Sequence, residues 1–94
     1  MDDLTNKTIL VTGTSKGIGA AVVKSLVAQG ANVVAHYCSD LAGMEDVLQS
    51  LDTANITSLQ ADFRIAEQVD SLWQKAIAWR GGIDVLINNA AIVR

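Results

Sequence analysis

The feature that most constrains the fold of this chain is a glycine-rich turn between an apolar run and an amphipathic segment. Residues 12–19 read Thr-Gly-Thr-Ser-Lys-Gly-Ile-Gly and directly follow the apolar run 9–11. Glycine permits the positive φ of a sharp strand-to-helix turn and lets main-chain N–H groups approach a ligand closely. The free N–H groups and the positive dipole end of the following helix attract phosphate. In this context the turn predicts a dinucleotide pyrophosphate site, with a purely structural tight turn as the alternative.

Apolar runs alternate with helix-period segments along the whole chain. We predict strands at residues 8–11, 33–37, 56–61 and 83–87. The three helical stripes between them comprise Ile18, Val22, Leu26 and Val27, then Leu41, Met44, Val47, Leu48 and Leu51, then Val69, Leu72, Trp73, Ala76 and Ile77. The order βαβαβαβ predicts an α/β fold with a parallel sheet. Fold analogy gives a Rossmann-type doubly wound sheet with strand order 3-2-1-4.

The size and composition of the chain allow one domain and exclude several classes of function. The 94 residues carry a net charge of −3 and no basic run, which argues against a nucleic-acid surface. No apolar stretch approaches the ~20 residues that a membrane helix needs. Cys38 is the single cysteine, so no internal disulfide is possible, and the acidic start is unlike a secretory signal. We therefore predict a cytoplasmic protein.

The expected topology leaves part of the sheet uncovered. Two helices would cover one face, the third helix would cover the other face almost alone, and the fourth strand would be an open edge. Open apolar edges favour pairing with another chain. We therefore expect residues 1–94 to be an incomplete portion of a single domain, with a missing carboxy-terminal half or another chain covering the fourth strand.

Two spaced motifs resemble one enzyme family. The pattern Thr-Gly-x-x-x-Gly-Ile-Gly at residues 12–19, together with Asn-Asn-Ala-Ala at residues 88–91, is similar to the short-chain dehydrogenases/reductases, and most of all to 3-oxoacyl-carrier-protein reductases. The resemblance covers essentially the whole chain. It implies an NAD(P)(H)-dependent oxidoreductase that transfers hydride between a nicotinamide cofactor and a carbonyl or alcohol substrate. In that family this region supplies only the adenosine and pyrophosphate site.

The resemblance also implies which residues bind the cofactor. In the glycine-rich turn these are Gly13, Ser15, Lys16, Gly17, Ile18 and Gly19. Tyr37, Cys38 and Ser39 would surround the adenosine ribose. Asp62 would accept a hydrogen bond from the adenine amino group and the Phe63 N–H would meet a ring nitrogen, although Asp62 could equally cap the following helix. Asn89, Ala90 and Ala91 would lie under the ribose, with Ala91 standing where the family often has glycine.

The end of the second strand bears on the choice of cofactor. NAD-preferring members carry an acidic residue there, whereas this chain has Tyr37. The nearest acid, Asp40, is expected to cap the next helix. Lys16 stands where NADP-preferring members have a basic residue. The sequence therefore favours NADP over NAD.

No catalytic residue can be assigned within the 94 residues. The family uses a Tyr-x-x-x-Lys arrangement with a serine, but Tyr37 is the only tyrosine and Leu41 stands four residues after it. We expect the chain alone to be inactive. The alternative is a non-catalytic nucleotide-binding or interaction module. His36, the only histidine, is interpreted as a core residue, and no metal site is predicted because about four ligands would be needed.

Overall fold

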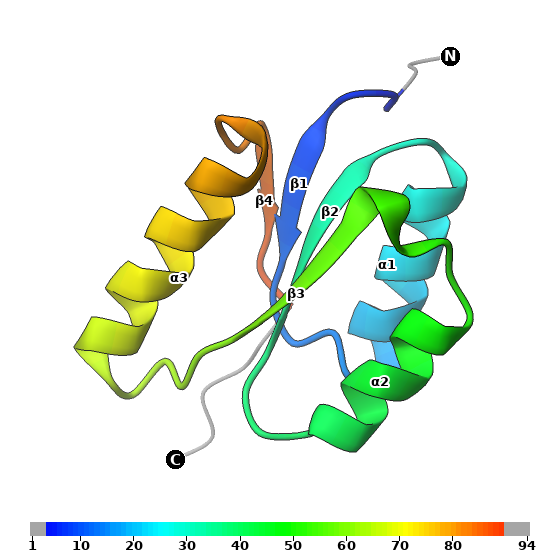
Figure 1. Ribbon diagram of the computed structural model, residues 1–94. Coiled ribbons are helices and arrows are strands. Elements are labelled where there is room, and N and C mark those ends of the chain that lie inside the picture. Colours follow the sequence, from blue (N-terminus) through cyan, green and yellow to red (C-terminus); the bar gives the residue numbers. More distant parts are fainter. Residues whose placement is uncertain (1–3, 90–94) are drawn as a thin grey trace.

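The computed structural model describes residues 4–89, which form a four-stranded sheet with helices on both faces (Figure 1). The elements in chain order are β1 (Thr8–Val11), α1 (Gly17–Ala28), β2 (Asn32–Tyr37), α2 (Leu41–Gln49), the 3-10 turn η1 (Thr53–Asn55), β3 (Ile56–Gln60), α3 (Ala66–Arg80) and β4 (Val85–Ile87). The predicted alternation of strands and helices is therefore confirmed.

The sheet is parallel throughout and has the strand order β3-β2-β1-β4 that was predicted. Leu10 of β1 aligns with Val34 of β2 on one side and with Leu86 of β4 on the other. Because the chain returns past β1 between β3 and β4, the direction of winding reverses beside β1. Crevices at such a reversal, outside the carboxyl ends of the strands, are where open α/β sheets bind ligands.

The two faces of the sheet are covered unequally. Figure 1 shows α1 and α2 together on one side and α3 alone on the other. The first side holds a continuous buried cluster that includes Val11, Val23, Val33 and Met44. The second side buries only Leu10, Val34 and Ala76 in its cluster. Large apolar side chains remain exposed on α3 and β4, namely Trp73 at 37%, Ile77 at 47% and Leu86 at 47%.

Some local expectations were wrong. Ile18 was grouped with the core stripe of the first helix, but its side chain is 75% exposed. The buried residues of α1 are Gly19, Ala20 and Val23, so the face of the helix that packs on the sheet does not include position 18. β4 begins at Val85 rather than at residue 83. Among the described residues, no helix is long and apolar enough to cross a membrane.

Candidate functional site

A cavity of about 400 Å³ opens at the carboxyl end of β1 and β2, where the glycine-rich turn meets the segment after β2. Its volume falls within the roughly 300–1,000 Å³ range of small-molecule sites. The lining residues are Gly13, Ser15, Lys16, His36, Cys38, Ser39, Asp40 and Asn89. Six of these eight were predicted as site residues from the sequence, and the two additions are His36 and Asp40.

The start of α1 lies beside this cavity and has no side-chain cap. The helix begins at Gly17, and the preceding Lys16 is extended and makes no capping hydrogen bond. The first-turn N–H groups of a helix have no partner inside the helix. No acidic residue occupies the first turn of α1. The turn thus keeps hydrogen-bond donors and the positive end of the helix dipole for an external anion.

Two glycines of the turn serve different purposes. Gly17 has a φ of +64°, which favours glycine, and a Cβ built there would meet nothing within 4 Å. Gly19 has no such φ, but its Cβ would collide with the Gly13 carbonyl and come within 2.7 Å of the Asn89 Nδ2. Gly17 therefore provides backbone conformation and open space, whereas Gly19 allows α1 to pack directly against the turn.

The glycine-rich turn is tied to β2 through a single residue, His36, which is only 2% exposed. The Gly13 N–H donates to its Nδ1 at 3.1 Å. Its main-chain carbonyl accepts from both the N–H and the hydroxyl of Thr14, each at 2.9 Å. His36 was expected to be a core residue, but these partners were not predicted, because they lie 22 and 23 positions away in the sequence.

A second set of hydrogen bonds ties the turn to the end of β4. Asn89 donates its main-chain N–H to the Thr12 hydroxyl at 2.9 Å and its side-chain amide to the Gly13 carbonyl at 3.0 Å. The Thr12 hydroxyl in turn donates to Asn88 Oδ1 at 3.0 Å. The asparagines therefore join the ends of two neighbouring strands, β1 and β4. Ala90 and Ala91 lie outside the described residues.

The residues after β2 divide between the cavity and the core. Tyr37 is not among the lining residues, because its ring packs with the cluster under α1 and α2. Asp40 caps α2 as expected, accepting from the Gly43 N–H at 2.9 Å. A Cβ on Gly43 would come within 2.6 Å of the Ser15 carbonyl, so the first turn of α2 lies directly against the glycine-rich turn.

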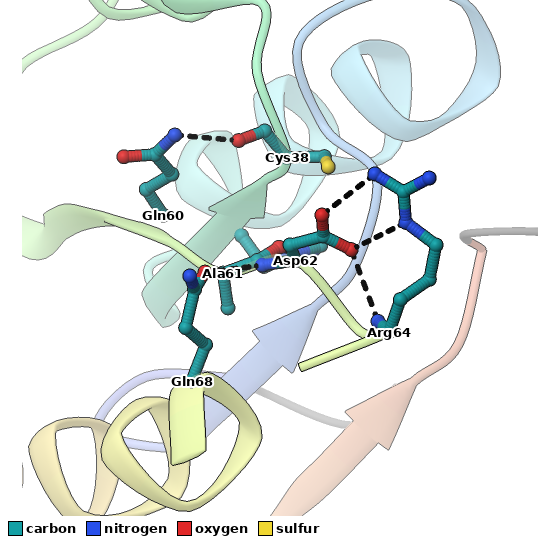
Figure 2. A network of polar contacts seen from close by, with 7 residues as sticks. Cys38, Gln60, Ala61, Asp62, Arg64 and Gln68 are labelled. Carbon is teal, nitrogen blue, oxygen red and sulfur yellow. Dashed lines mark hydrogen bonds and ion pairs between the residues drawn. The ribbon is translucent and has the colours of Figure 1, made fainter. Parts of the chain in front are cut away.

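The turn after β3 is held by the ion pair shown in Figure 2. Arg64 donates its main-chain N–H and Nε–H to Asp62 Oδ1, each at 3.0 Å, and an NH2 group to Oδ2 at 2.8 Å. These bonds lower the pKa of Asp62 from 3.8 to about 2, and they raise the pKa of Arg64. The Asp62 N–H donates to Gln68 Oε1 at 2.8 Å, and Phe63 stacks on the His36 ring.

Arg64 is a candidate site residue that the sequence analysis did not identify. Its side chain is 79% exposed, and its guanidinium is paired with the Asp62 carboxylate (Figure 2). The sequence feature that could have identified Arg64 is its place as a basic residue two positions after Asp62. Among residues 4–89, no group of three or more histidine, cysteine or acidic side chains is arranged to hold a metal ion.

The fold and the site define a class of protein, the nucleotide-binding half of a doubly wound α/β domain. Comparison with known proteins identifies the family within that class. The model for "short chain dehydrogenase" matches residues 7–94, and the chain belongs to the short-chain dehydrogenase/reductase family of nicotinamide-dependent oxidoreductases.

Two curated relatives and one solved structure illustrate this membership. The chain is 43% identical to 3beta-hydroxysteroid dehydrogenase 1 of Eggerthella lenta, over 97% of this chain and 36% of that protein. It is 33% identical to the 3-oxoacyl-[acyl-carrier-protein] reductase of Staphylococcus aureus, over 94% of this chain and 37% of that protein. A blue fluorescent protein from a metagenomic library, solved with NADPH, superposes with a TM-score of 0.87 at 36% identity, over 99% of this chain and 39% of that one. The chain thus spans well under half the length of these proteins.

Proposed function

We propose that residues 1–94 form the adenosine and pyrophosphate site of an NADP(H)-dependent short-chain oxidoreductase. The whole enzyme would transfer hydride between the nicotinamide and a carbonyl or alcohol substrate, and the catalytic residues would come from outside this chain. The supporting observation is the uncapped start of α1 beside a cavity of about 400 Å³. The donors present suit an anion, since main-chain N–H groups, serine hydroxyls and a lysine surround the opening.

The roles of the residues follow from the bonds that they already make. The Gly13 N–H is used by His36, so the pyrophosphate would be bound by N–H groups from Ser15 onwards, with the exposed Ile18 packing against the cofactor. On the adenine side, each carboxylate oxygen can accept two hydrogen bonds. Asp62 Oδ1 already accepts two from Arg64 and Oδ2 accepts one, which leaves Oδ2 for the adenine amino group.

The preference for NADP rests on the charges around the ribose. Lys16 lines the cavity and would meet a 2′-phosphate, and Arg64 carries a second positive charge on the turn after β3. A single charge pair at ~4 Å is worth about 4 kcal/mol before desolvation at an effective dielectric of ~20. Asp40 opposes this attraction, but its Oδ1 is bound by the Gly43 N–H. Arg64 is already paired with Asp62 and Asp40 is capped, so the preference for the phosphorylated ribose rests mainly on Lys16.

The test is a comparison of NADPH and NADH binding by calorimetry. The variant Lys16→Ala should weaken NADPH about tenfold and leave NADH unchanged. Lys24→Ala, on the exposed side of α1, removes the same charge away from the cavity and should change neither. Equal losses for both cofactors, or no loss in Lys16→Ala, would contradict the preference for NADP. Tyr37→Asp should shift the preference towards NADH.

We also propose that the 94 residues alone show no dehydrogenase turnover. Their only tyrosine, Tyr37, packs against the core and lacks a lysine four residues later. The absorbance of NADPH at 340 nm, followed with a panel of ketones, measures this directly. Turnover by residues 1–94 would refute the assignment of catalysis to another part of the protein. Absence of any nucleotide binding would instead favour the interaction module.

A further inference from the structure

The imidazole of His36, which lines the cavity, contacts segments that lie far apart in the sequence. Its Nδ1 accepts from the Gly13 N–H at 3.1 Å, and its Nε2 lies 2.8 Å from the Ala61 carbonyl oxygen. The ring of Phe63 stacks on it with centroids 4.3 Å apart and an interplanar angle of 12°. One buried ring thus joins the glycine-rich turn, the end of β3 and the turn that carries Asp62.

These contacts define the protonation state of the ring. The Gly13 N–H can only donate, so Nδ1 must be unprotonated and accept. The Ala61 carbonyl can only accept, so Nε2 must carry the proton and donate. The geometry therefore requires the neutral Nε2–H tautomer, with both ring nitrogens satisfied. Burial lowers the pKa of His36 below its usual 6.5, although the hydrogen bond to Ala61 partly offsets this effect.

A second proton would break this arrangement. The Nδ1–H of an imidazolium would point at the Gly13 N–H, so that two donors face each other in a site that is only 2% exposed. To relieve the repulsion between these two donors, the glycine-rich turn would have to move away from His36. Gly13 and Thr14 are both held by His36, and the N–H groups proposed to bind phosphate begin at the next residue.

We propose that His36 is a positioning residue for the cofactor: its neutral form holds the glycine-rich turn in the shape that binds the pyrophosphate, and its protonation releases the turn. The proposal rests on the proposed function. It assigns no contact between His36 and the reacting atoms. Its consequence is that NADPH binding weakens as the pH falls through the pKa of His36, which lies below 6.5.

Titratable groups on the segments around the ring act on this equilibrium in both directions. Cations disfavour the imidazolium and anions favour it. The groups on the surrounding segments are Lys16 on the glycine-rich turn, Cys38 and Asp40 after β2, Glu45 on α2, Asp62 and Arg64 after β3, and Glu67 at the start of α3. Asp62 is paired with Arg64, which limits its pull on His36. The dependence on pH should therefore be measured at constant salt, because screening changes these contributions.

Two substitutions of His36 by amide residues test the roles of the two ring nitrogens separately. The amide oxygen of asparagine can take the place of Nδ1 and accept from Gly13, whereas the longer glutamine can place its amide nitrogen near Nε2 and donate to Ala61. Both remove the ring and its stacking on Phe63. We expect His36→Asn to bind NADPH within about threefold of the parent protein, with no dependence on pH between 5 and 8. His36→Gln should bind at least tenfold more weakly at every pH.

Calorimetric titrations of both variants, with 2′,5′-ADP as a second probe, test the proposal. Equal affinities of the two variants, or a persistent pH dependence in His36→Asn, would overturn it. Thermal unfolding of each variant is the control, because a merely structural role would reduce both stabilities without separating the two affinities.

Nuclear magnetic resonance provides a test that does not need a bound cofactor. His36 is the only histidine, so its ring nitrogens can be identified without ambiguity. We expect the Nε2–H tautomer at pH 8, and a shift of the Gly13 amide signal that follows the titration of the ring. A protonated Nδ1 at pH 8, or an unchanged Gly13 amide, would overturn the proposal. If this coupling is present but NADPH does not bind, the proposed function fails while the control of the turn by His36 stands.

Discussion

The two turns that border the cavity are stabilised in opposite ways. The glycine-rich turn is held by neutral groups in the interior, among them Thr14 at 0% and His36 at 2% exposure. The turn after β3 is held by an ion pair in which Arg64 is 79% exposed. A turn that binds a ligand through main-chain N–H groups needs supports that leave those groups free and add no competing charge. A turn that offers a carboxylate can be oriented by a cation without losing its function.

The strongest test of this comparison is Gly19→Ala. The added methyl would meet the Gly13 carbonyl and the Asn89 amide, and the first of these is backbone that cannot rotate away. Overpacking of this kind costs about 2–3 kcal/mol in the free energy of unfolding. Urea denaturation measures the loss, and NADPH titration should show that binding is lost with it.

Gly17→Ala is the matched control for the packing of Gly19. Its methyl would meet nothing within 4 Å, so only the left-handed φ opposes it. That strain is worth about 1–2 kcal/mol. If Gly17→Ala destabilised the protein more than Gly19→Ala, close packing of α1 on the turn would not be the dominant constraint.

Thr14→Val should have the next largest effect. The substitution keeps the shape of the side chain but removes a buried hydroxyl that donates to the His36 carbonyl at 2.9 Å. The carbonyl keeps the Thr14 N–H as a partner, so we expect a loss of about 1 kcal/mol in the free energy of unfolding. Ser15→Ala is the control, since no hydrogen bond depends on its hydroxyl in the described structure, and it should unfold like the parent. An unchanged urea midpoint for Thr14→Val would argue against buried support of the turn.

Asn89→Ala tests the connection to β4. The variant loses the hydrogen bond from Nδ2 to the Gly13 carbonyl, and Asn89 is exposed, so water can replace the lost donor. We expect a loss of at most about 1 kcal/mol, together with a severalfold weaker binding of NADPH. A loss larger than that of Thr14→Val would mean that the exposed connection supports the turn more than the buried one.

Arg64→Ala should have the smallest effect on stability, because exposed ion pairs contribute little. Its clearest signature is the pKa of Asp62, which should rise from about 2 towards 3.8 when the arginine is removed. A lowered carboxylate pKa adds stability that is complete above 3.8 and is lost as the pH falls to about 2. The parent protein should thus lose this small contribution as the pH falls from 3.8 to about 2, whereas the variant should largely lack it at every pH. Carboxylate titration by nuclear magnetic resonance would show an unchanged pKa if the ion pair did not form in solution.

Much of the fold follows directly from the sequence, because periodicity and glycine position are local signals. The start of α1 and the capping role of Asp40 were expected from short stretches of chain, whereas the strand order came from fold analogy. Tyr37 shows a signal that was present but not used: it alternates in phase with Val33 and Ala35, which face the core under α1 and α2. Phase alone therefore predicts that its ring packs in the core rather than in the cavity.

The hydrogen bonds that hold the site in place could not be predicted from such local signals. His36 bonds to Gly13 across 23 positions and to Ala61 across 25 positions, so these partners are set by strand register and not by neighbouring residues. The ion pair between Arg64 and Asp62 spans only two positions, so it could have been predicted from the sequence. Ile18 shows the limit of periodicity, since it shares the helical spacing of Val22 and Leu26 but is exposed, whereas the adjacent Gly19 and Ala20 are buried.

The contact between Gly43 and the Ser15 carbonyl limits how the cofactor preference of this protein could be redesigned. Exchanging the segment after β2 for that of an NAD-dependent enzyme would normally bring in a new helix start as well. Any side chain at position 43 would collide with the Asp40 carboxylate and the Ser15 carbonyl, and a shift of Ser15 would move the turn that we propose to bind phosphate. A successful exchange of the segment after β2 therefore has to end before α2 or retain Gly43. We expect libraries that randomise position 43 to consist mostly of variants that bind neither cofactor.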